Sequence, residues 1–71
     1  MVEMNGQMTL TLPSVSTMTG KTIFFRNINN TEVTIIGYTT SDLINGQLNL
    51  VVRLKNSTFG LYSNGSNWAI I

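Results

Sequence analysis

The chain has 71 residues, no cysteine and no histidine, and only 10% of its residues are charged, with a net charge of +1. This composition excludes a disulfide framework and removes the imidazole that metal sites and general bases usually need. The small net charge gives no electrostatic footprint for nucleic acid, and no polybasic segment or long apolar run indicates a membrane. In so small a domain, apolar burial and lost conformational entropy each amount to about 100 kcal/mol and nearly cancel. We therefore expect oligomerisation to supply the missing stability.

The beginning of the chain predicts a lead-in, a strand and a loop within one domain that covers residues 1–71. Residues 1–6 lack a basic segment, which indicates a flexible lead-in rather than a signal peptide. Residues 8–12 alternate between apolar and polar side chains, as in a half-buried strand, and Pro13 is expected to end it. Residues 14–20 are mostly small and hydroxyl-bearing, which predicts a loop.

The next segment predicts a strand and a turn. Residues 22–26 are rich in β-branched and aromatic side chains, with Phe25 on one face and Phe24 on the other. Residues 27–31 form a cluster of turn-forming residues, in which Ile28 is still expected to point to the core.

The middle of the chain predicts two short strands that flank an irregular segment. Val33–Ile36 is an apolar strand that Gly37 is expected to stop. Residues 38–45 predict a loop, in which Ser41 could cap one helical turn. Residues 48–52 again alternate with a period of two.

The end of the chain predicts a hairpin. Residues 58–63 and 67–71 flank Asn64-Gly65, and this dipeptide favours a type I′ turn between two strands. The dipeptide also occurs at Asn5-Gly6 and Asn45-Gly46. Since no segment has helical periodicity, we expect an all-β fold, namely a small antiparallel β-sandwich or barrel-like domain of five to six short strands.

Few side chains could carry catalysis, and no catalytic, metal or cofactor site is predicted. Glu32 and Asp42 could approach each other as a carboxylate pair of the glycosidase type. The favoured interpretation is that both are solvated turn residues, so an enzyme is not expected. Copies of either residue from several subunits of an oligomer could still gather around one cation.

Three Asn-x-Ser/Thr triplets begin at Asn29, Asn56 and Asn64. They would be glycan acceptors in a secreted eukaryotic protein, but in a chain so rich in these residues chance is the favoured explanation.

Three aromatic residues suggest a binding surface. Exposed rings next to amides can bind sugars, whereas a buried ring belongs to the core. Trp68 lies in mid-strand with Ile70 on the same face, so we expect it in the core with its indole N–H on a backbone carbonyl. Tyr62 and Tyr38 are the candidates for contact with a receptor or with another subunit.

The sequence resembles the carboxy-terminal domain of bacteriophage tail and head fibres and of viral spikes. The resemblance covers most of the chain from Met8 onwards, in the segments 10–13, 20–28, 33–35 and 61–70. Its most specific part is Ser-Asn-Gly-Ser-Asn-Trp at residues 63–68, where many such domains have Ser-Asp-Gly-x-Asn-Trp-Tyr. This chain departs from that pattern at Asn64 and Ala69, and the missing aromatic at 69 could remove a contact surface.

The resemblance implies a homotrimer at the end of a fibre on the virion, made in the host cytoplasm and following an upstream shaft. Asn64, Gly65 and Trp68 would then form its structural hairpin. Two functions are compatible with this assignment: a domain that trimerises and caps the fibre, or a tip module that binds a host cell-surface glycan or protein. Neither nucleic acid nor a membrane is an expected partner.

Overall fold

The computed structural model describes residues 1–28 and 32–71, and these form β-strands and one 3₁₀ helix. The elements are β1 (Val2–Met4), β2 (Met8–Thr11), η1 (Val15–Met18), β3 (Thr22–Asn27), β4 (Val33–Ile36), β5 (Asn49–Val52), β6 (Thr58–Ser63) and β7 (Trp68–Ile70). The all-β prediction is therefore confirmed. The described residues contain seven strands rather than the expected five to six.

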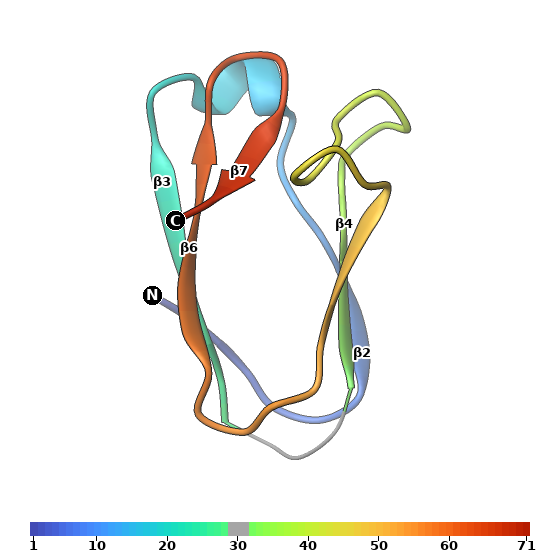
Figure 1. The fold of residues 1–71 in the computed structure, drawn as a ribbon, viewed down its shortest axis with the longest axis vertical. Helices are drawn as coiled ribbons and strands as arrows, with labels where there is room; N and C mark the ends of the chain where they lie inside the picture. The colour runs from blue at the N-terminus through green and yellow to red at the C-terminus, as the bar shows by residue number, and fades with distance from the viewer. Residues whose placement is uncertain (29–31) are drawn as a thin grey trace.

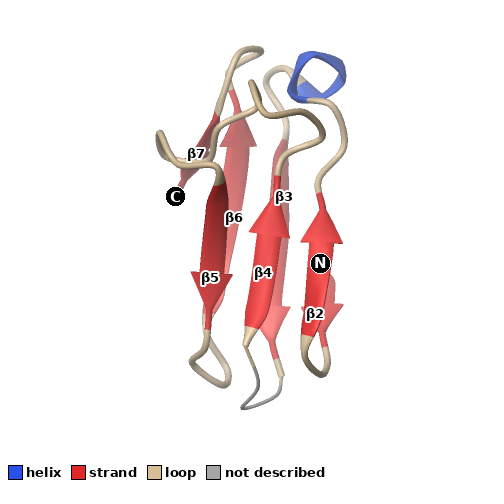
Figure 2. Cartoon of the chain, turned by 90° about the vertical axis from the view of Figure 1, so that its right-hand side faces the viewer, coloured by secondary structure: helices blue, strands red, loops and turns tan. Residues whose placement is uncertain are grey.

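The strands form two sheets that face each other (Figure 1). One sheet has the order β1-β3-β6-β7 and the other the order β2-β4-β5, which faces the viewer in Figure 2. Both are mixed, because β1 pairs with β3 and β2 with β4 in parallel. The first four strands alternate between the sheets (Figure 1). As a result, β3 returns to the sheet of β1, and β4 returns to the sheet of β2, each in the same direction as its predecessor. This alternation corrects the prediction of a purely antiparallel arrangement.

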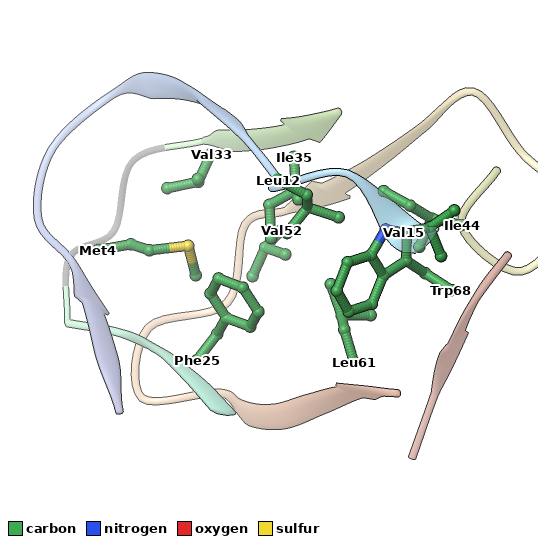
Figure 3. Packing of buried hydrophobic residues seen from close by; sticks show 10 residues of the cluster. All are labelled: Met4, Leu12, Val15, Phe25, Val33, Ile35, Ile44, Val52, Leu61 and Trp68. Carbon is green, nitrogen blue, oxygen red and sulfur yellow. The ribbon is translucent and has the colours of Figure 1, made fainter. Parts of the chain in front are cut away.

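The core lies between the two sheets and follows the alternation of the strands (Figure 3). On β3 the side chain of Phe25 points into the core (Figure 3), and Phe24, on the opposite face as predicted, is exposed. Phe25 stacks on Phe59 of β6, with ring centroids 5.5 Å apart. The buried hydrophobic residues are Met4, Leu12, Val15, Phe25, Val33, Ile35, Ile44, Val52, Leu61 and Trp68.

Two segments near the beginning of the chain are more ordered than predicted. Residues 1–6, expected to be a flexible lead-in, contain strand β1, and Met4 of that strand is completely buried. The expected loop at 14–20 contains η1, which places Val15 in the core. In both cases a buried apolar side chain and hydrogen bonds to distant parts of the chain order a segment whose sequence lacks a clear period.

The turn cluster and the irregular middle segment also differ from expectation. Asn27 ends β3 as a buried residue, Ile28 is half-buried, and residues 29–31 lie outside the described part. Ser41 does not cap a helical turn; its N–H donates to Thr39 Oγ1 at 3.3 Å, within a run of turns. Leu48 precedes β5 and is exposed.

The loop between β4 and β5 closes one side of the molecule by pairing with β7. Trp68 N–H donates to Leu43 O, and Asn45 N–H donates to Trp68 O, both at 2.8 Å. Ile70 N–H donates to the side-chain Oδ1 of Asn45 at 3.1 Å. The outer edge of β7 is therefore satisfied within the chain, which removes one open strand edge.

Candidate functional site

The predicted hairpin is present, but its turn is of another kind. β6 and β7 pair with Ser63 opposite Trp68, so the connection has four residues, 64–67. Gly65 has a positive φ of 94°, whereas Asn64 does not, which rules out a type I′ turn. Asn64 Oδ1 instead accepts the N–H groups of Ser66 and Asn67, at 2.9 and 2.8 Å. This Asx turn needs a side-chain oxygen acceptor, which Asp provides as well as Asn.

The expected type I′ turn occurs at Asn45-Gly46, where both residues have positive φ, 51° and 81°. Ile44 and Gln47 exchange backbone hydrogen bonds across this turn, at 2.8 and 2.9 Å. At Asn5-Gly6 only the glycine has a positive φ. The same dipeptide therefore forms different turns, depending on the hydrogen bonds around it.

Trp68 belongs to the core, as predicted, with 1% of its surface exposed. Its ring lies among Leu61, Ile44 and Val15 (Figure 3). The predicted hydrogen bond to a backbone carbonyl is absent, since none of the described residues accepts from its indole N–H. Packing therefore accounts for the position of the ring.

The end of β6 is tied to η1 beside this ring. Ser63 Oγ is buried and donates to Val15 O at 2.7 Å, and it accepts Gly65 N–H at 3.2 Å. Gly20 N–H and Lys21 O pair with the backbone of Ser63. These contacts hold the hairpin and η1 together as one unit at this end of the molecule.

The two candidate tyrosines lie on opposite faces of the molecule. Tyr62 points outward from β6, in register with Thr22 and Ala69, and is 38% exposed. Tyr38 follows β4 in the other sheet and is 64% exposed. One partner surface therefore cannot contact both tyrosines. A functional role has to be assigned to each of them separately.

Tyr38 borders an open hollow of about 380 Å³ beside the ends of β4 and β5. Its apolar lining comes from Ile36, Leu48 and the tyrosine itself, and its polar lining includes Thr40 and Asn49. No charged residue contributes to the lining. The combination of an aromatic ring with hydroxyl and amide groups suits a neutral ligand that has both apolar faces and hydroxyl groups.

The structure separates the two acidic residues that could have formed a pair. Glu32 precedes β4 and forms an ion pair with Arg53 at 2.9 Å, while Asp42 lies in the loop beyond the other end of β4. Asp42 is 9% exposed and accepts from Val15 N–H and Thr39 Oγ1, both at 3.1 Å. The expectation that Asp42 is a solvated turn residue is therefore wrong.

Among the described residues, no group of three or more His, Cys, Asp or Glu side chains could hold a metal ion within one chain. In the same part of the chain, no helix is long and apolar enough to cross a membrane. Of the predicted triplets, Asn29 lies outside the described residues, Asn56 is exposed in a turn, and Asn64 holds its own loop through its side chain.

The structure also contains contacts that the sequence analysis did not single out. Asn45 was recognised as a turn residue, but its side-chain bond to Ile70 joins residues 25 positions apart. Gly60 was not selected, although its missing side chain leaves room for Ile71 and Phe24. Comparison with known proteins shows no matching family model, no similar curated protein and no similar solved structure.

Proposed function

We propose that this chain is the carboxy-terminal domain of a viral fibre or spike, where it forms a homotrimer that caps the fibre. The observation that carries the trimer is the distribution of apolar side chains. In the described part of the chain ten large hydrophobic residues are exposed, the same number that form the core. With 10% charged residues, against about 25% in an ordinary domain, this surface favours burial against a partner.

The assignment to a fibre is supported by the segments that carry the resemblance. The most specific of them, residues 63–68, forms a complete local structure, in which the Asn64 side chain holds the loop and Trp68 anchors the returning strand in the core. A compact unit of two facing sheets, 31 Å long and 20 by 16 Å across, is suited to side-by-side packing around a fibre axis.

The mass of the purified protein in solution tests this proposal. Static light scattering at micromolar concentration is expected to give the mass of three chains. A thermal midpoint that rises with protein concentration is also expected, because folding is then linked to assembly. A single-chain mass over the accessible concentration range would contradict the proposal.

The second candidate, a host-receptor tip module, is favoured by the hollow at Tyr38. Its uncharged lining, with an aromatic ring beside Thr40 and Asn49, suits a cell-surface glycan better than an acidic or basic ligand. Screening the trimer against a glycan array tests this function, with Tyr38→Ala and Tyr38→Phe as variants. Loss of binding in Tyr38→Ala, retention in Tyr38→Phe and an unchanged mass are expected if the ring packs on a sugar.

A further inference from the structure

The outer face of the four-stranded sheet carries a continuous apolar surface, which we call the outer patch. It consists of Phe24, Gly60, Tyr62, Ala69 and Ile71. Phe24 lies opposite Gly60 in register, and Tyr62 lies opposite Ala69. Ile71 continues the pairing beyond β7, since its N–H donates to Gly60 O at 2.9 Å. Phe24, Tyr62 and Ile71 are 51%, 38% and 63% exposed.

Gly60 makes the outer patch continuous. A Cβ atom at this position would lie 2.8 Å from Ile71 Cγ1 and 3.1 Å from Phe24 Cε1. The side chains of Phe24 and Ile71 therefore close over the glycine from both neighbouring strands, and Gly60 itself is buried beneath them. The result is one apolar surface across three strands instead of separate exposed residues.

We propose that the outer patch is the surface through which each copy of this chain packs against the other two around the threefold axis. The inference rests on the proposed trimer and identifies the face that forms it. The partner that covers the outer patch is a second copy of the same chain. The area of this face, its composition and its charges support this choice.

The area that a stable interface needs favours a whole face over a strand edge. Such an interface buries ~800 Å² on each partner, about a fifth of the 4210 Å² accessible surface of this chain. The sheets are separated across the intermediate axis (Figure 1), so each outer face measures about 31 by 16 Å. The edge at β7 is already paired with Leu43 and Asn45. An outer face, ~500 Å² in outline, therefore comes closer to that area than the paired edge of β7 does.

Composition distinguishes the two faces. The outer face of the three-stranded sheet presents Thr9, Thr11, Thr34 and Asn49 from adjacent strands, with Val51 and the half-buried Ile36 beside them. Interface centres are enriched in aromatic residues, and threonine is under-represented among the residues that dominate binding. The outer patch has two aromatic rings and an isoleucine, and none of its side chains is charged, so it is the better interface centre.

The rim of the outer patch carries one charge of each sign. On the same face, Glu3 of β1 lies opposite Arg26 of β3 in register, and both side chains are exposed. Because every copy presents both signs, an acid of one subunit can meet a base of the next around a closed ring. This complementarity favours a second copy over a partner with a uniformly charged surface.

Paired substitutions on the two faces test the inference. Phe24→Thr removes an exposed ring from the outer patch, and Val51→Thr places the same residue on the opposite face, where Val51 is 40% exposed. By light scattering across a dilution series, Phe24→Thr is expected to raise the dissociation constant of the trimer at least a hundredfold, while Val51→Thr leaves it within a few-fold of the parent. A circular dichroism spectrum confirms that each variant is folded.

Cross-linking provides a second measurement that does not depend on weakening the trimer. The chain has no cysteine, so Thr22→Cys and Thr34→Cys each introduce a single thiol, one on each outer face, at half-buried positions. A short bismaleimide is expected to link chains of Thr22→Cys and not of Thr34→Cys.

The outcomes separate this inference from the proposed function. A trimeric parent in which Phe24→Thr dissociates no more than Val51→Thr, or in which Thr22→Cys cross-links no more than Thr34→Cys, would overturn the interface and leave the trimer standing. A parent protein of single-chain mass would overturn both.

Discussion

At the scale of single residues, Asp42 shows how a polar side chain can join distant parts of the chain. Its carboxylate accepts the Val15 N–H from η1 and the Thr39 hydroxyl from its own loop. A buried carboxylate is tolerated only when such hydrogen bonds replace its hydration. Gly37 permits this arrangement, because a Cβ there would overlap the backbone carbonyl of Asp42. The sequence could not indicate the role of Asp42, since its partner is a backbone N–H 27 residues away.

Removal of this carboxylate is expected to destabilise the fold. Asp42→Ala leaves the buried Val15 N–H without an acceptor and should lower the free energy of unfolding by about 1–3 kcal/mol. Asp42→Asn keeps one oxygen acceptor and should cost less. Glu32→Ala is the control, since its ion pair with Arg53 is exposed and is expected to contribute only ~0–1 kcal/mol. Urea denaturation measures all three, and equal losses for Asp42→Ala and Glu32→Ala would contradict the assigned role.

At the scale of elements, the period-two pattern was a good guide to strands and a poor guide to their pairing. The strands β3, β4 and β6 were predicted within a residue of their observed bounds, because alternating β-branched and aromatic residues reflect one buried face. The parallel pairing of β1 with β3 depends on crossings between sheets, which a local pattern does not record.

Turn chemistry was likewise only partly predictable. Asn45-Gly46 forms the expected type I′ turn, whereas Asn64-Gly65 opens a four-residue loop because the Asn64 carboxamide accepts two N–H groups beyond it. Within the candidate site, the hairpin was predictable from the Asn64-Gly65 dipeptide between two strands, and the burial of Trp68 from alternation. The closure of Phe24 and Ile71 over Gly60 was not, because it depends on the register between three strands.

Asn45 is expected to protect the edge of β7. Asn45→Gly keeps a residue that tolerates positive φ but removes the oxygen that accepts Ile70 N–H. We expect a loss of about 0.5–1.5 kcal/mol and faster hydrogen exchange of the Ile70 amide in NMR spectra. Asn45→Ala also strains the turn and should cost about 1–2 kcal/mol more. An unchanged exchange rate at Ile70 in Asn45→Gly would show that this side chain does not protect the edge.

At the scale of the whole molecule, the stability of one subunit and the proposed assembly of three are linked through a small core. The ten buried hydrophobic residues include Trp68 of the hairpin, whose ring lies beside Leu61 of β6 and Val15 of η1 (Figure 3). A 71-residue chain without disulfides has little stability in reserve, so a loss in the core of each subunit also reduces the population able to assemble.

Trp68 provides the most direct test of this linkage. Trp68→Ala should cost about 3–5 kcal/mol per subunit because it leaves a large cavity, and three such losses are expected to prevent trimer formation in light scattering. Trp68→Phe is the matched control. It keeps most of the apolar volume and removes an indole N–H that no described residue accepts, so it should lose no hydrogen bond and should remain trimeric. A Trp68→Ala protein that stays trimeric and loses only receptor binding would show that the ring acts as a ligand platform. If Trp68→Ala and Trp68→Phe dissociated equally, assembly would require the specific packing of the indole and not only its apolar volume.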